Sequence, residues 1–403
     1  MRRFLGHAGA ISLLACACRE APAHRARVSL RDSAGVEIVE SVPPAWSAVA
    51  AWVIDTLPTL DIGDDVADPN QEFTAPSRPI RFGDGRIAVS DHGSQQIRFF
   101  DVSGRWIRSV GQRGRGPEEF TDLRVLVRGP GDSLFAYEPH SNVLSVLDSA
   151  GRFVRRARPE LTAPGRSTTF AGVFDDGRWL VEAREFIRPT TGGVYRGTIT
   201  LYEYSAEGER GDSLTTIPGV ESFAEPVADQ GYRSLLLPLG RGALTTVHGA
   251  RAYFGVTERV DLRVYRRGVG LERIVRISLP ERPITREVID RTVDDWTANW
   301  RTDEREQLGG KLRGATYPDN VPALSDLLVA DHGELWFREH EMEPDAASRF
   351  VVTDSTGRWV AWVVGPTRFW PSWIGEDLVL GLWYDPDGVA HVRAYRLSRI
   401  EPE

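Results

Sequence analysis

The chain has 403 residues, of which 41% are hydrophobic, enough for one large repeat domain or two ordinary domains. Its formal net charge is −8, which argues against a nucleic-acid-binding protein, because such proteins normally present a basic surface. The two cysteines, Cys16 and Cys18, both lie near the start, so the rest of the chain can form neither a disulfide nor a cysteine-ligated zinc site.

The chain begins with the pattern of an export signal. A basic start, MRR, precedes a short apolar stretch over 4–15 that is too short to cross a bilayer as a helix. The run LLAC, ending at Cys16, resembles a bacterial lipobox, in which the cysteine is lipidated and becomes the mature N-terminus. We therefore expect a lipoprotein signal peptide over 1–15, lipidation of Cys16 (alternatively Cys18) and a tether over 16–31.

This segment also predicts where the protein resides. Ala17 follows Cys16, in place of the aspartate associated with retention in an inner membrane. We expect an extracytoplasmic protein, anchored to the cell envelope through its lipid, at the outer membrane if the cell has two. No later apolar run is long enough for a transmembrane helix. The alternative is an ordinary cleaved signal with incidental cysteines.

Self-similar hairpins dominate the sequence after the tether. The stretches DVSGRW (101–106), DSAGRF (148–153) and DSTGRW (354–359) each stand between two β-rich apolar runs. Asp in the first turn position and Gly in the fourth are typical of tight turns. A further strand precedes each hairpin, which gives units of four antiparallel strands at a period of roughly 45 residues, the signature of propeller blades.

Six such units can be counted, and they predict an all-β chain that forms a six-bladed β-propeller over 32–403. The units occupy 76–111, 122–159, 166–217, 243–280, 323–365 and the C-terminal segment. The last unit has three strands, and we expect WVIDTLPTLDIG (52–63) to supply its fourth. GVEIVES (35–41) is expected to add a strand there. An N-terminal strand that closes the ring covers an edge that would otherwise template aggregation.

The glycine-rich stretch GQRGRGPEEF (111–120) joins the first two units. It lacks the G-K-[ST] ending of a phosphate-binding P-loop, and no helix is expected after it. We interpret it as a loop between blades.

Residues 285–313 break the β pattern and predict a helical insertion between the fourth and fifth blades. Apolar side chains recur there at a helical spacing of three and four, namely Ile289, Val293, Trp296 and Trp300. Thr285 is the expected N-cap and Gly309-Gly310 the expected stop. An aromatic stripe at helical spacing favours packing of the insertion on blade edges, and the insertion can at the same time cover one mouth of the central channel, since the two roles are compatible.

Four stretches carry a family resemblance: DSAGV (32–36), the 52–63 strand, GRIAVSD through GPEEF (85–120) and LPLGRG (237–242). Together they resemble the 6-bladed β-propeller proteins of the NHL-like secreted or lipoprotein type, which are common in soil and marine bacteria. The resemblance covers about 32–399. It implies the fold but leaves the function open, because such propellers include protein-binding, RNA-binding and enzymatic members.

The richest polar stretch is EHEMEPD (339–345), and no serine-hydrolase elbow or H-E-x-x-H helix accompanies it. Glu339, Glu341 and Glu343 could hold a divalent cation, the one cofactor considered, although a solvated acidic loop is the simpler interpretation. The acidic turn DIGDDVAD (61–68) lacks the order of a calcium loop. Gluconolactonase-type propellers hold a cation with acids and an asparagine, and that residue set cannot be matched here.

The sequence therefore favours a lipid-anchored, extracytoplasmic binding or scaffolding propeller for a protein, peptide or glycan ligand. We expect a monomer with no catalytic set and no nucleic-acid partner. The alternative is a metal-assisted lactonase, lyase or hydrolase with its site in the central channel.

Overall fold

The computed structural model describes residues 26–46, 51–63, 68–159, 166–227, 231–343 and 345–399. The expected signal peptide, Cys16 and Cys18 lie outside the described residues. Neither helix of the described part has the length and apolar character needed to cross a membrane.

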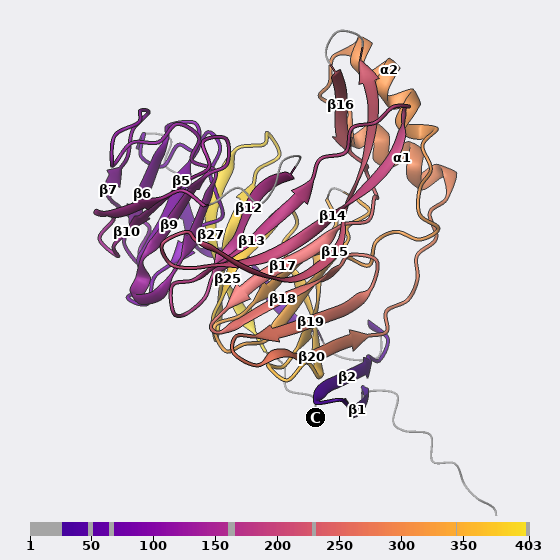
Figure 1. Ribbon diagram of the computed structural model, residues 1–403, viewed down its shortest axis with the longest axis horizontal. Helices are drawn as coiled ribbons and strands as arrows, with labels where there is room; N and C mark the ends of the chain where they lie inside the picture. The colour runs from indigo at the N-terminus through magenta and orange to yellow at the C-terminus, as the bar shows by residue number, and fades with distance from the viewer. Residues whose placement is uncertain are drawn as a thin grey trace, which may run out of the picture.

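The described strands form five hydrogen-bonded sheets (Figure 1). Two of them have four antiparallel strands each. The first contains β4 (Ile80–Arg81), β5 (Ile87–Asp91), β6 (Gln96–Phe100) and β7 (Trp106–Val110). The second contains β8 (Val125–Arg128), β9 (Leu134–Glu138), β10 (Val143–Leu147) and β11 (Phe153–Ala157), and a short 3-10 turn at Pro130–Asp132 follows β8.

The other three sheets are larger. One contains β12 (Arg166–Val173), β13 (Trp179–Glu185), β14 (Gly193–Tyr204), β15 (Arg210–Val227) and β16 (Gly231–Leu236). Another is built from β17 (Ala243–His248), β18 (Arg251–Val256), β19 (Val260–Arg266), β20 (Gly270–Ile277), β2 (Val36–Val42) and β1 (Arg27–Ser33). The eight-stranded sheet runs β21 (Leu324–Val329), β22 (Leu335–Glu339), β23 (Ser348–Thr353), β24 (Trp359–Gly365), β3 (Trp52–Ile62), β27 (Ala390–Ser398), β26 (Leu378–Tyr384) and β25 (Phe369–Ile374).

The repeated D-x-x-G stretches form the hairpin turns expected of them. In the first, one Asp101 carboxylate oxygen accepts the backbone N–H groups of Ser103 and Arg105. Gly104 has a φ of +84°, a left-handed conformation that glycine adopts without steric cost. Asp148 and Asp354 accept the corresponding backbone donors in their own turns.

The N-terminal strand β3 completes the last sheet, as its sequence predicts. β3 pairs antiparallel with β27 through most of its length, for example Ile62 with Val392 and Val53 with Ser398. The start of the same strand also pairs, in parallel, with β24. One strand from near the chain start thus links the last two groups of strands into a single sheet.

The expected position of the 35–41 strand is wrong. β2 pairs in parallel with β20, not with the C-terminal sheet, and places Val39 opposite Val275 in the buried core. Glu37 and Glu40 form ion pairs with Arg273 and Arg276 of β20, at 2.6 and 3.0 Å. Burial and matched charges therefore direct this strand to the fourth unit. β1 then covers β2, so the sheet begins at Arg27, inside the segment expected as tether.

The core lies between neighbouring sheets. Phe82 and Phe99 of the first sheet stack at 6.1 Å and pack with Leu126, Leu134 and other side chains of the second. Equivalent clusters join the second sheet to the third and the third to the fourth. Burying one such aromatic side chain stabilises the fold by roughly 1.5–3 kcal/mol, so these interfaces hold adjacent sheets in a fixed arrangement.

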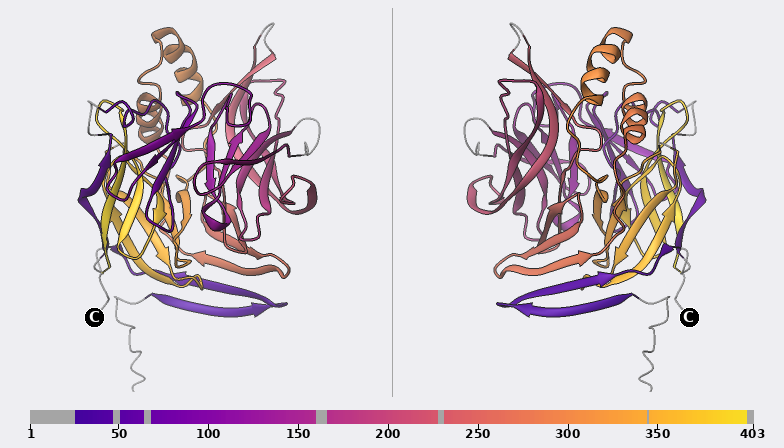
Figure 2. Two further views of the ribbon diagram at one scale, coloured as in Figure 1. Left: turned by 90° about the vertical axis from the view of Figure 1, so that its left-hand side faces the viewer. Right: turned by 90° about the vertical axis from the view of Figure 1, so that its right-hand side faces the viewer.

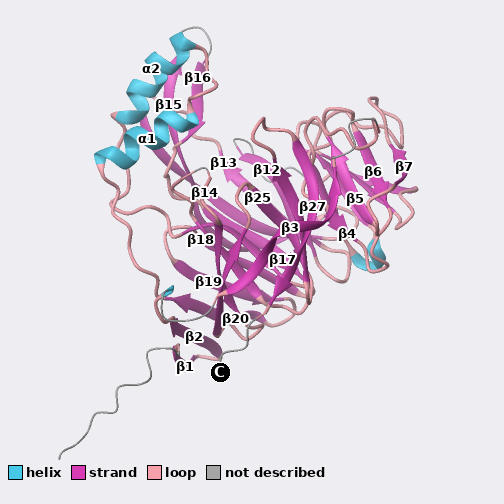
Figure 3. Ribbon diagram, turned by 180° about the vertical axis from the view of Figure 1, so that it is seen from behind, coloured by secondary structure: helices cyan, strands magenta, loops and turns pink. Residues whose placement is uncertain are grey.

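The third sheet extends into an arm that the sequence did not predict. The start of β14, the end of β15 and β16 project beyond the rest of the sheet, and both helices lie against them (Figures 1 and 3). Buried Phe223 and Leu237 of the arm pack against Val293 and Leu312 of the helices. The helical segment therefore packs on an extended blade edge.

The helices are α1 (Arg286–Trp296) and α2 (Thr302–Arg313). Thr285 caps α1, because its side chain accepts the backbone N–H of Val288. The stop expected at Gly309-Gly310 is wrong, since α2 continues through both glycines to Arg313, with Gly314 as its C-cap. Gly309 is buried within α2, where an added Cβ would lie 3.1 Å from the Arg313 guanidinium of the same helix and in ordinary contact with Val293 of α1.

GQRGRGPEEF forms a self-contained loop between β7 and β8. Its ends are tied by hydrogen bonds from Phe120 N to Gln112 O and from Gly114 N to Phe120 O. A carboxylate oxygen of Glu119 accepts Gly116 N at 2.7 Å. A strand follows the loop, and these hydrogen bonds of its backbone stay within it, which agrees with its interpretation as a connection between sheets.

Candidate functional site

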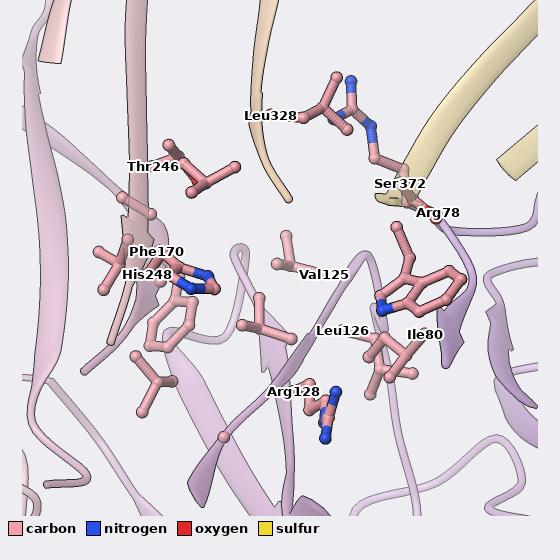
Figure 4. Close-up of a pocket in the computed structure, with 18 of the residues that line it drawn as sticks. Arg78, Ile80, Val125, Leu126, Arg128, Phe170, Thr246, His248, Leu328 and Ser372 are labelled. Carbon is pink, nitrogen blue, oxygen red and sulfur yellow. The ribbon is translucent and has the colours of Figure 1, made fainter. Parts of the chain in front are cut away.

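The innermost strands of the sheets surround one large cavity of about 1010 Å³ (Figure 4). Its walls come from six strands, β4, β8, β12, β17, β21 and β25, so every sheet contributes to it. Apolar side chains, including Ile80, Leu126 and Leu328, form part of the wall, and charged groups lie toward the ends of the strands. A cavity of this size stands at the upper end of the range for small-molecule sites.

The starts of the inner strands lie together at one end of the cavity and their last residues at the other end, which gives the cavity two distinct mouths. We call the end that holds the strand starts the entry mouth, where Arg78 before β4 forms an ion pair with Asp326 of β21. We call the other end the far mouth, where Asp175 N, after β12, donates to Gly249 O, after β17, at 3.0 Å.

The entry mouth carries a second charged cluster around Asp122. Its carboxylate pairs with Arg124 at 2.7 Å and with His140, and His92 lies 3.8 Å away. Burial opposes ionisation of Asp122, but the hydrogen bonds from His140 and Arg124 prevail and hold its pKa below the ordinary value. A side pocket of about 410 Å³ adjoins this cluster, and His92, Arg124 and Tyr384 are among its lining residues.

The far mouth gathers polar groups from several sheets. Arg128 forms an ion pair with Asp132 at 2.6 Å, and the Trp373 indole N–H donates to Asp331 at 2.9 Å. His248 lies half-buried in the cavity wall, where burial lowers its pKa. Asp331 acts in the opposite direction, and the charges of Arg251 and Arg128 add to the lowering.

The acidic residues proposed as metal ligands do not come together. Glu339 pairs with Arg349 at 3.2 Å and Glu341 with Arg338 at 2.7 Å, while exposed Glu343 lies 3.8 Å from Arg291. Across the part of the chain that the structure describes, no group of three or more histidine, cysteine or carboxylate side chains has the arrangement of a metal site.

His340, in the same stretch, and Asp61, in the other acidic stretch, are also engaged in the fold. Burial, together with the charge of Arg282, lowers the pKa of His340 to about 4. In the other acidic stretch, Asp61 pairs with His391 at 2.8 Å and with Arg393 at 2.6 Å.

Sequence reasoning missed a structural role for the acid that ends the second strand of a unit. Glu138 is buried and accepts hydrogen bonds from Thr121 N, Thr121 Oγ1 and Asp122 N. Asp91, at the same place in the first unit, accepts Ala75 N at 2.8 Å. Each carboxylate holds the segment that leads into the inner strand of its own sheet, β8 for Glu138 and β4 for Asp91, and the recurrence of an acid there was the available signal.

Comparison with known proteins agrees with this architecture. Residues 72–127 match a family model described as 6-bladed beta-propeller. The chain is similar to 6-bladed β-propellers. No curated protein matches it.

Solved structures with a similar fold share little sequence with the chain. A calcium-binding protein, regucalcin, from Agrobacterium tumefaciens is 12% identical, with 88% of this chain and 99% of that chain covered and a TM-score of 0.42. A putative exported protein from Bacteroides fragilis is 12% identical, with 86% and 98% covered and a TM-score of 0.47. A streptogramin B lyase is 11% identical, with 86% and 98% covered and a TM-score of 0.39. These likenesses concern the fold and not the activity.

Proposed function

We propose that the chain is a six-bladed propeller whose central cavity binds a ligand in the cell envelope. The eight-stranded sheet counts as two blades joined by β3, so six inner strands surround the cavity. The helical segment between β20 and β21 is an insertion between the fourth and fifth blades. A packed ring of this kind is rigid, which suits a preformed binding site.

The observation that carries the binding role is the cavity itself, with its apolar wall and polar ends. A volume of about 1010 Å³ accommodates a small glycan, a short peptide or the exposed end of a protein segment. We favour binding over metal-assisted catalysis because the entry-mouth carboxylates Asp122 and Asp326 already pair with arginines. An arginine beside a carboxylate competes with a cation for the same oxygen atoms.

We further propose that Cys16 carries a lipid that anchors the protein to the envelope. The β1–β2 hairpin follows the N-terminal segment and lies at the opposite end of the molecule from the helices and the arm (Figure 2). A chain anchored there holds the arm away from the membrane. Mass spectrometry of the protein from its host tests this: diacylglyceryl on Cys16 supports the anchor, and an unmodified mature chain contradicts it.

A channel-filling variant tests the binding role. Thr246 lies in the cavity wall, so Thr246→Trp fills part of the space, and Val269→Trp places the same side chain in an exposed turn (67% exposed). We expect thermal-shift screening with neutral sugars, acidic sugars, amino acids and dipeptides to identify compounds that stabilise the wild type and Val269→Trp but not Thr246→Trp. Equal stabilisation of all three proteins, or none by any compound, would overturn the proposal.

A further inference from the structure

The far mouth gathers charged, aromatic and imidazole groups from several sheets at one end of the cavity. The Arg81 guanidinium packs over the Trp373 indole, 4.6 Å from its centroid, and that indole donates its N–H to Asp331. The charge of Asp331 acts on His248, as does that of Arg128, whose guanidinium donates to the Arg81 carbonyl at 3.2 Å. Figure 4 shows Arg128 and His248 around the same space as Ile80 and Leu126.

Arg81 differs from the other arginines in the cavity wall. Arg78, Arg124 and Arg128 each pair with an aspartate, but Arg81 makes no ion pair with a carboxylate of the described residues. Arg81 is half-buried and its guanidinium packs on the Trp373 ring, so part of the entropic cost of ordering this side chain is met before a ligand binds. A fixed, unneutralised guanidinium is the group that best recognises a carboxylate or phosphate.

The remaining groups of the far mouth limit the charge of the ligand. Asp331 and Asp175 line the same cavity, and they repel a second negative charge. Burial lowers the pKa of His248, so a neutral imidazole at pH 7 offers one hydrogen-bond donor and one acceptor without adding positive charge. Carboxylate acceptors and a neutral imidazole suit hydroxyl groups, while Ile80 and Leu328 offer apolar contact to a carbon skeleton.

We infer that the far mouth binds a monoanionic carboxylate that also carries hydroxyl groups, the chemistry of an acidic sugar, with Arg81 on the carboxylate. This inference rests on the proposed function, because it requires a ligand in the cavity. Asp331 and His248 then contact the hydroxyl groups, and the Trp373 ring positions Arg81.

Titration calorimetry with two matched probes tests the inference. D-galacturonate and D-galactose differ only in the carboxylate at one carbon. We expect the full-length wild type to bind galacturonate at least tenfold more tightly than galactose. Arg81→Gln should remove that preference, and Arg81→Lys should retain part of it by keeping the charge. Arg152→Gln, which removes an exposed arginine paired with Asp148 in a distant hairpin turn, should change nothing.

The outcomes separate this inference from the proposed function. Equal affinity of the wild type for both sugars, an Arg81→Gln protein that keeps the preference, or no binding of galacturonate overturns the carboxylate site. The proposed binding role of the cavity still holds in any of these cases if another compound stabilises the wild type but not Thr246→Trp. Unchanged melting temperature of Arg81→Gln shows that its affinity loss does not come from unfolding.

Discussion

Glu138 gives the sharpest test of how the connection from the first sheet is fixed where it enters the second sheet. Its buried carboxylate accepts Thr121 N at 2.6 Å, Thr121 Oγ1 at 2.7 Å and Asp122 N at 3.0 Å. Glu138→Ala leaves these donors without their acceptor, and an unpaired buried donor costs about 1–3 kcal/mol. Since water can reach some of the space, we expect a total loss of about 3 kcal/mol in the free energy of unfolding.

Urea denaturation followed by tryptophan fluorescence measures this loss. Glu138→Gln keeps one oxygen acceptor and should cost about half as much as Glu138→Ala, because the bonds lose only their charge assistance. Glu207→Ala, at an exposed turn position, is the matched control and should change the free energy by less than about 0.5 kcal/mol. Amide exchange should quicken at Thr121 and Asp122. A Glu138→Ala protein as stable as Glu207→Ala would refute the reasoning.

Two further predictions concern pH and the interblade loop. The pKa of His340 is about 4 in the folded protein and about 6.5 in the unfolded chain, so between these pH values only the unfolded chain takes up the proton. The contribution of His340 to the free energy of unfolding is therefore fully present above pH 6.5 and falls by about 2 kcal/mol by pH 5. His340→Gln should remove that part of the difference between urea titrations at pH 7.5 and 5, and an unchanged pH dependence would contradict it. Gly111 has a φ of +92°, and a Cβ added there would lie 2.6 Å from the Phe120 ring. Gly131 also has a positive φ, but a Cβ added there meets no atom within 4 Å. We therefore expect Gly111→Ala to lower the free energy of unfolding by about 1–3 kcal/mol more than Gly131→Ala does. Equal melting temperatures of these two variants would show that the contact with Phe120 does not constrain the loop.

The turns and the closing strand could be predicted because their signals are local or repeated. Asp101 and Gly104 fix a turn within six residues, and the same pattern recurs at Asp148 and Asp354. The last unit lacked a strand, and the 52–63 segment had the alternation to supply it. The destination of β2 was missed because it depends on Arg273 and Arg276, more than two hundred residues away.

The candidate site was harder to predict for the same physical reason. Arg81, His248 and Trp373 stand at the ends of inner strands from three different units, and only closure of the ring brings them to one mouth. The acidic stretch 339–345 attracted attention because its charges are adjacent in sequence. In the fold, Glu339 and Glu341 turn instead to separate arginines. Aligning the inner-strand ends of the units would have indicated the far mouth.

The central claim is that the cavity binds a small ligand, which requires that small solutes reach its wall more easily than bulky ones do. The chain has no cysteine beyond Cys18, so Thr246→Cys in a protein with Cys16 and Cys18 replaced by serine carries a single thiol. We expect the small reagent methyl methanethiosulfonate to modify this thiol readily. A polyethylene-glycol maleimide of about 5 kDa should react with it at least tenfold more slowly than with the exposed thiol of Val269→Cys. A Thr246→Cys thiol that resists the small reagent, or that reacts with both reagents as Val269→Cys does, would contradict the account.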